Sequence, residues 1–147
     1  MGSKKGTTDM HTERNSRKKP RQHEVQSFSS EALRYLVAGV RRFAKARDWD
    51  QFHSPKNLSM SLAIEAAEIM EHFQWLSETE SRGLNRRTLA KVEDEIGDVQ
   101  LYLVRLSDML GVDPLAAARN KLRKTARKYP VARAKGSARK YTEFRTK

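Results

Sequence analysis

The chain has 147 residues, a length that fits one domain, and it carries 30 Lys and Arg against 18 Asp and Glu, for a formal net charge of +12. The absence of cysteine excludes disulfides, thiolate metal sites and cysteine nucleophiles. The sequence contains no apolar run long enough for a membrane span and no apolar segment of a secretory signal near its start, so we expect a soluble, cytoplasmic protein.

The basic excess lies at the two ends of the chain. Residues 1–24 have a net charge of +4, residues 119–147 have +11, and residues 25–118 between them have −3. Strong basic charge is typical of nucleic-acid-binding proteins, but an acidic centre does not fit a binding surface that covers the domain. Nucleic-acid binding through the ends stays open as an alternative.

Residues 1–27 are predicted to form a disordered basic tail. The first 24 residues contain only two apolar side chains, Met1 and Met10, which are too few to offset the entropy lost on ordering. The basic run from Arg17 to Arg21 has the composition of a nuclear import signal. Nuclear localisation therefore stays open beside the cytoplasm.

Helical patterns follow the tail. Two helices are predicted at about 30–47 and 59–76, where apolar residues recur at steps of three and four. A third begins at Arg86, behind Asn85 as a cap, and ends at Gly111. Its apolar residues alternate steps of four and three, which is typical of a core helix and also of a coiled-coil seam between subunits.

A fourth helix completes the predicted fold. It opens at Asp113 and Pro114, an N-cap followed by a first-turn proline, and ends before Pro130. Four helices with short connections predict an all-α, four-helix bundle over 28–130, followed by a basic C-terminal segment over 131–147. Because about 100 residues make a small core, we expect oligomerisation to complete it.

Two pairs of carboxylates carry the functional signal. Glu65 and Glu68 lie on the second predicted helix, and Glu95 and Asp98 lie on the third. The spacing of three residues places both members of a pair on one side of their helix, at the margin of its apolar stripe. Either pair alone reads as an ordinary solvated flank. Two packed helices would bring four like charges together, where each raises the pKa of the others.

A divalent cation would relieve this repulsion. All-oxygen ligands favour hard ions such as Mg²⁺ or Mn²⁺ over zinc, whereas a di-iron site would require a Glu-x-x-His repeat. His72 follows Glu68 by four residues, and the third helix contains no histidine. Because Mg²⁺ in proteins is commonly shared with substrate phosphates, and Lys and Arg are abundant, the pattern suggests a nucleotide polyphosphate as substrate.

The carboxylate pattern resembles that of the MazG-like all-α nucleoside triphosphate pyrophosphohydrolases, which have ExxE on one helix and ExxD on the next. Five segments are similar to the dCTP pyrophosphatase branch of this family: FAKARDWDQFHSPKNL (43–58), FQWL (73–76), EIGDVQLYLV (95–104), RKYP (127–130) and KGSARKYTEF (135–144). The similarity covers about 28–144. The order and spacing of the five segments is more specific than the carboxylate pattern alone.

The resemblance implies Mg²⁺-dependent hydrolysis of a nucleoside triphosphate to the monophosphate and pyrophosphate, in a homo-oligomer that is usually a dimer of dimers. It implies catalytic and metal-binding roles for Glu65, Glu68, Glu95 and Asp98. Aromatic rings would enclose the base, and basic residues would hold the phosphates. The candidate substrate-binding residues are Trp49, His53, Trp75, Tyr102, Lys121, Thr125, Arg127, Tyr129, Arg139, Lys140 and Tyr141. From the residues alone, the tryptophans are interpreted as core residues, and the Lys and Arg residues as a solvent-exposed basic face.

One position departs from the dCTP branch. Thr125 stands where that branch often has an Asn in contact with the base, and threonine cannot offer both an amide donor and a carbonyl acceptor. The resemblance implies dCTP or a modified dCTP as substrate, in cleaning or balancing the nucleotide pool. A broader specificity for several dNTPs stays open, and a basic bundle that binds nucleic acid is the alternative outside the enzymes.

Overall fold

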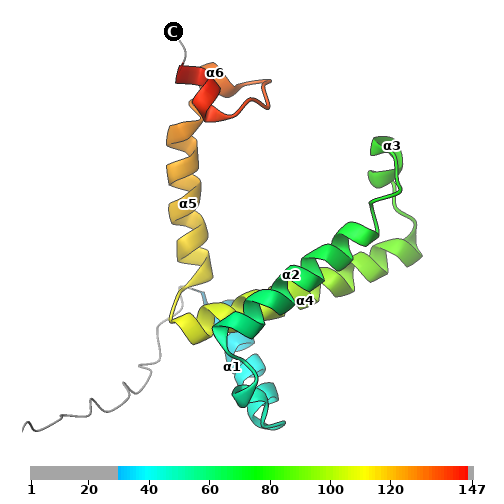
Figure 1. The fold of residues 1–147 in the computed structure, drawn as a ribbon, viewed down its shortest axis with the longest axis vertical. Helices are drawn as coiled ribbons and strands as arrows, with labels where there is room; N and C mark the ends of the chain where they lie inside the picture. The colour runs from blue at the N-terminus through cyan, green and yellow to red at the C-terminus, as the bar shows by residue number, and fades with distance from the viewer. Residues whose placement is uncertain (1–29, 146–147) are drawn as a thin grey trace, which may run out of the picture.

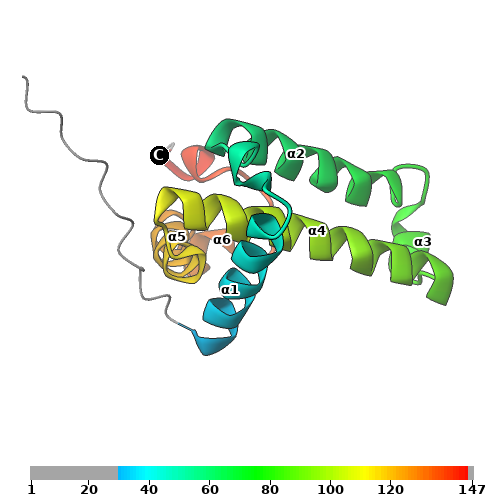
Figure 2. The ribbon, with the colours of Figure 1, turned by 90° about the horizontal axis from the view of Figure 1, so that it is seen from below.

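Every regular element of the described chain, residues 30–145, is a helix (Figure 1 and Figure 2). In this computed structural model the four long helices are α1 (Glu31–Lys45), α2 (Pro55–Glu71), α4 (Arg86–Leu110) and α5 (Pro114–Lys128). Four short elements lie between and after them: η1 (Trp49–Gln51), α3 (Glu78–Ser81), α6 (Val131–Ala134) and η2 (Tyr141–Arg145). The all-α prediction is confirmed, and the predicted tail at 1–27 lies outside the described residues.

The ends of α4 follow from its capping residues. The Asn85 side chain accepts a hydrogen bond from the backbone N–H of Thr88 at 2.9 Å, which satisfies one of the free donors of the first turn. At the other end, Gly111 adopts φ 67°, a left-handed conformation that glycine allows without steric penalty. The helix therefore has the bounds that its capping residues predict.

The second helix differs from its predicted bounds of 59–76. It begins at Pro55 because the Ser54 side chain caps it, accepting from the backbone N–H of Asn57 at 3.2 Å, and because proline suits the first helical position. It ends at Glu71, after which the backbone forms turns through Leu76. The apolar residues near 73–76 continue the helical spacing without continuing the helix.

Residues beyond Pro130 fold back onto the end of α5. The ring of Tyr129 packs edge-on against Tyr141 and Phe144, with centroid distances of 5.9 and 6.2 Å. The Arg133 guanidinium donates to the Phe144 carbonyl oxygen at 3.2 Å. The predicted basic segment is therefore a small aromatic cluster at the tip of α5, with its basic side chains outside.

Three helices make the packed part of the molecule. The antiparallel helices α2 and α4 lie side by side along their length, and α1 crosses the C-terminal half of α4 (Figure 1 and Figure 2). Leu33 and Val37 of α1 pack on Val104 of α4 at the centre of this crossing. Within the described residues the buried apolar core is small, so packing inside one chain supplies only part of the stabilisation that a domain of this length needs.

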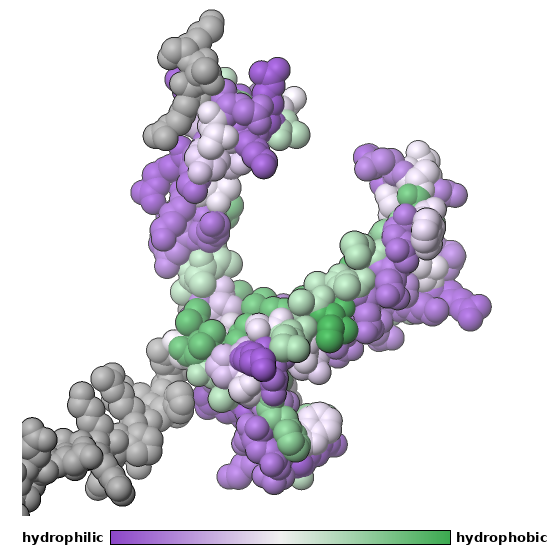
Figure 3. All heavy atoms as spheres, in the orientation of Figure 1, coloured by the Kyte–Doolittle hydropathy of each residue, from purple (hydrophilic) through white to green (hydrophobic). Residues whose placement is uncertain are grey.

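The fourth long helix, α5, projects from the end of α4 and contains no buried residue (Figure 1). Apolar side chains gather in the hollow between α5 and the α2–α4 pair (Figure 3). The large apolar side chains that are more than half exposed include Ile64, Ile96, Leu110, Leu122 and Val131. Exposed apolar surface of this extent marks an interaction face. None of the described helices is long and apolar enough to cross a membrane.

An ion-pair network joins α1 to α4 beside the apolar core. Arg105 and Asp108, one turn apart on α4, are only 6% and 9% exposed, and the Arg105 Nη1 donates to the Asp108 Oδ2 at 3.2 Å. Arg41 of α1 donates to both oxygens of the same carboxylate, with Nε 2.9 Å from Oδ2. Buried charges require such partners because their removal from water is unfavourable.

Replacing Asp108 by Asn should therefore destabilise the fold. The change keeps the shape of the side chain but leaves Arg105 short of its buried counter-charge, and we expect the free energy of unfolding to fall by about 3 kcal/mol. Urea denaturation followed by circular dichroism measures the difference. Asp94→Asn, at an exposed position of the same helix, is the matched control and should change stability by less than about 0.5 kcal/mol. Equal effects of the two substitutions would contradict the structural role of the network.

Candidate active site

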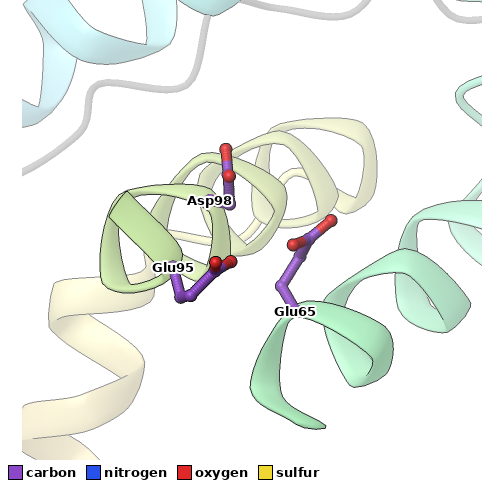
Figure 4. A group of neighbouring side chains, drawn as sticks. All are labelled: Glu65, Glu95 and Asp98. Carbon is purple, nitrogen blue, oxygen red and sulfur yellow. The ribbon is translucent and has the colours of Figure 1, made fainter. Parts of the chain in front are cut away.

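Three carboxylates meet where α2 and α4 pack together. Oxygen atoms of Glu65, Glu95 and Asp98 all lie within 4.8 Å of one another. Glu65 extends from α2 toward α4, and Glu95 and Asp98 lie on adjacent turns of α4 (Figure 4). Glu68 lies one turn from Glu65 on α2 and is not among the residues whose oxygen atoms meet within this distance. The structure thus brings together Glu65, Glu95 and Asp98, and the charge of Glu68 acts on both Glu65 and Glu95.

The arrangement disfavours full ionisation of the group. Partial burial raises the pKa of Glu65, and the neighbouring charges of Glu68, Asp98 and Glu95 raise it further. Burial and the charge of Glu68 likewise raise the pKa of Glu95, which the nearby His72 partly offsets. Like charges held this close are stabilised when a cation enters between them. The group therefore has the charge and the oxygen donors of a site for a hard divalent ion.

A cavity of about 450 Å³ adjoins the carboxylates. Its walls come from α1, from the segment around η1 and from α4, and they are mostly aromatic and aliphatic. The lining residues are Tyr35, Leu36, Gly39, Val40, Phe43, Trp49, His53, Asp98, Leu101, Tyr102 and Arg105. The volume is in the range of small-molecule sites. Asp98 belongs to both the cavity and the carboxylate group, so a molecule in the cavity would lie next to that group.

The segment between α1 and α2 carries one aromatic wall of the cavity. Asp48 adopts φ 54°, a left-handed conformation that aspartate accepts more readily than most residues, and the chain turns there into η1. Trp49 then packs edge-on against Phe43, with ring centroids 5.6 Å apart, and against His53 at 6.2 Å. These contacts hold an open aromatic surface that suits the flat face of a base.

Arg105 links the wall to α4. Its Nε donates to His53 Nδ1 at 3.2 Å, and its Nη2 donates to the Asp50 carboxylate. Burial and the positive charge of Arg105 lower the pKa of His53, while Asp50 opposes the shift. The network that joins α1 to α4 thus extends to the cavity: it fixes His53 of the cavity wall and Asp50, the residue next to Trp49.

The predicted substrate residues fall into two groups in the structure. Trp49, His53 and Tyr102 line the cavity. Trp75 is 87% exposed and lies in the turn that follows α2, away from the cavity lining. The remaining predicted residues also lie outside the lining, on α5 or in the segment folded onto its tip: Lys121, Thr125, Arg127, Tyr129, Arg139, Lys140 and Tyr141.

Two cavity features were missed by sequence reasoning. Arg105 was not singled out, although it follows Asp98 by seven residues and Tyr102 by three and so shares their helix face. Tyr35 and Phe43 lie two turns apart on one face of α1, on either side of Gly39. Arg105 could have been found from its spacing once Asp98 was chosen, whereas Tyr35 and Phe43 have no spacing to a recognised residue that marks them as part of a site.

Comparisons with known proteins identify the family of the chain. Residues 60–144, more than half of the chain, match the model of the MazG-like family. Human dCTP pyrophosphatase 1 is 42% identical over 124 residues, which cover 80% of this chain and 71% of the human protein. The bovine dCTP pyrophosphatase 1 is 39% identical over 124 residues, covering 80% of this chain and 72% of the bovine protein.

A solved structure shares the fold. A pyrophosphatase from Archaeoglobus fulgidus superposes with a TM-score of 0.65 at 38% sequence identity, covering 71% of this chain and 97% of the archaeal chain. The family match spans both carboxylate-bearing stretches of the sequence, including Glu65 on α2 and Asp98 on α4. The chain therefore belongs to the MazG-like family of nucleoside triphosphate pyrophosphohydrolases.

Proposed function

We propose that this enzyme hydrolyses dCTP, or a modified dCTP, between the α and β phosphates to give dCMP and pyrophosphate, and that it thereby removes unwanted nucleotides from the pool. The observation that carries the proposal is the junction at Asp98 between the carboxylate group and the aromatic cavity. One end of this site suits the phosphates with their metal, and the other suits a base. The names of the human and bovine relatives support dCTP as the substrate.

Mg²⁺ is the cofactor that fits the carboxylate group best. Glu65, Glu95 and Asp98 offer oxygen atoms within 4.8 Å of one another, and Glu68 adjoins them. Oxygen donors without sulfur select hard ions, so Mn²⁺ is a possible substitute. When bound, the ion would neutralise phosphate charge and lower the pKa of a water molecule at the α phosphorus. One of the four carboxylates would accept the proton of that water.

The chain's own aromatic residues would bind the nucleoside. Trp49 offers an exposed ring at one wall of the cavity and Tyr102 lies on α4 one turn beyond Asp98. Stacking on such rings contributes about 1–3 kcal/mol per base. A base held there would place its triphosphate toward Asp98, which orients the reacting bond before the chemical step.

A second copy of the chain would complete the site. Lys121 and Arg127 are suited to phosphates, but α5 carries them away from the cavity of the same chain (Figure 1). The exposed apolar side chains on α2, α4 and α5 supply a surface for association. We propose a homo-oligomer, a dimer of dimers, in which α5 of one copy brings its basic side chains to the carboxylates of another.

A panel of nucleotides tests the reaction. Each of the four dNTPs and CTP is incubated with the protein and Mg²⁺, and the products are separated by ion-exchange chromatography. We expect dCMP and pyrophosphate from dCTP, at a kcat/KM above that of the other nucleotides. Similar rates for several dNTPs would favour the broader specificity that Thr125 leaves open. Release of free phosphate, or no turnover together with tight binding of DNA or RNA, would contradict the proposal and favour the nucleic-acid alternative.

Removing the carboxylate of Glu65 should make the protein more stable without metal and at the same time inactive. The folded state raises the pKa of Glu65, so its ionised form disfavours folding at neutral pH. Glu65→Gln should therefore raise the melting temperature in EDTA while abolishing both the stabilisation by Mg²⁺ and turnover. Thermal melts with and without Mg²⁺ measure the first two effects. Glu71→Gln, at an exposed position of the same helix, is the control and should retain the stabilisation by Mg²⁺. Full activity of Glu65→Gln would exclude its role as a ligand.

Mixing two inactive chains tests the shared site. Asp98→Asn removes a carboxylate, and Lys121→Ala with Arg127→Ala removes the proposed phosphate contacts. If these groups meet across two copies, co-expression should restore activity, to about a quarter of the wild-type value for random pairing about a two-fold axis. Activity that stays at the level of the separate variants would contradict a site built from two chains.

A further inference from the structure

Arg105 occupies the point where the cavity meets α4, and it uses each of its guanidinium nitrogens on a different partner. Nη1 donates to Asp108 at 3.2 Å, Nη2 donates to Asp50, and Nε donates to His53 Nδ1 at 3.2 Å. The side chain is 7% exposed. Asp108 is itself held by Arg41 of α1. The guanidinium is therefore held by α4 through Asp108, by the segment at and after η1 through Asp50 and His53, and indirectly by α1, whose Arg41 binds Asp108.

The hydrogen bond to His53 determines which ring nitrogen carries the proton. A guanidinium has five N–H donors and no acceptor, and it does not lose its proton in proteins. His53 Nδ1 must therefore accept with its lone pair, and the neutral ring carries its hydrogen on Nε2. Protonation of Nδ1 would break the bond and bring two cations into contact. The lowered pKa of His53, caused by burial and by the charge of Arg105, agrees with a neutral ring.

We propose that Arg105 is a positioning residue for nucleotide selection, because it fixes His53 with Nε2–H as a hydrogen-bond donor toward a base in the cavity. The inference rests on the proposed function, since the cavity must receive the base. A fixed donor favours N3 of cytosine, which is an acceptor, over N3–H of thymine, whereas a bond to O2 would not separate these two bases. A donor at the same place on another base would leave two N–H groups facing each other without a partner.

The same contacts would orient the aromatic wall. Asp50 and His53 belong to the segment that carries Trp49, and both are bonded to Arg105. The Trp49 ring in turn packs edge-on against His53. Arg105 therefore holds the donor and the stacking surface in one relative position. Lysine at 105 would keep the positive charge but could not supply three donors in this fork.

The proton on His53 can be measured without any substrate. Long-range ¹H–¹⁵N NMR of the histidine side chains at pH 8 distinguishes the two neutral forms, and His53→Gln assigns the signal. We expect the Nε2–H form in the wild type and a mixture of both forms in Arg105→Lys. The matched control is Arg87→Lys, at an exposed position on the same helix, which should leave the spectrum unchanged. The Nδ1–H form in the wild type, or an unchanged spectrum in Arg105→Lys, would overturn the proposal.

Kinetics then test whether Arg105 acts through His53. Loss of one hydrogen bond to the base should raise the KM for dCTP by about five- to tenfold in Arg105→Lys, with kcat changed by less than about twofold. His53→Gln, which keeps an amide donor near the Nε2 position, should retain a lower KM than His53→Asn. In a His53→Ala background, Arg105→Lys should have no further effect on KM. Independent, multiplying effects of the two substitutions would overturn the positioning role.

Failure of the two proposals can be told apart. If the wild-type protein hydrolyses no nucleotide, the proposed function fails, and nucleotide selection fails with it whatever the NMR result. If it hydrolyses dCTP but Arg105→Lys has the KM of Arg87→Lys, the proposed function stands and the role of Arg105 is wrong. Circular dichroism of every variant verifies that the helices are intact. Should Arg105→Lys unfold, the comparison of His53→Gln with His53→Asn decides whether the donor at Nε2 is used.

Discussion

A cation buried in the angle between α1 and α4 holds the described fold in its observed shape. The guanidinium of Arg105 is shielded from water and keeps its charge, so the chain must surround it with acceptors. Asp108 comes from the same helix, and Asp50 and His53 come from the segment after α1. Apolar contacts alone would leave that segment loosely attached. Directional bonds to one buried charge give it a defined position, and with it the wall of the cavity.

The helix α4 holds two opposite electrostatic environments within three turns. Near Arg105, each buried charge has a counter-charge within hydrogen-bond distance. Near Glu95 and Asp98, like charges approach one another across the helix pair and are only partly compensated. The first environment stabilises the chain by itself, whereas the second is stabilised by a ligand. The contrast explains how a small fold can carry a site that opposes folding. The paired charges around Arg105 lie on the same helix as the carboxylates of Glu95 and Asp98, and they stabilise the helix packing that the carboxylates weaken.

Local signals predicted most of the fold and the carboxylate group. Asn85 and Gly111 are residue types that mark the start and the end of a helix clearly. The three-residue spacing places Glu65 and Glu68 on one side of any regular helix, whatever the rest of the fold. The start of the second helix was missed because apolar periodicity is absent there, although Ser54 and Pro55 form a capping sequence. Arg105 could not be paired with His53 from spacing alone, since their contact depends on the path of the chain between α1 and α2.

The position of α5 has a consequence for the working protein. A helix of 15 residues without a buried side chain is marginal by itself in water, so its order depends on the surface that covers it. If that surface belongs to another copy, the ordered fraction follows mass action and increases with the amount of protein. Dilution would then lower the activity per molecule. The expression level in the cell would therefore affect the catalytic rate of each molecule as well as the number of molecules.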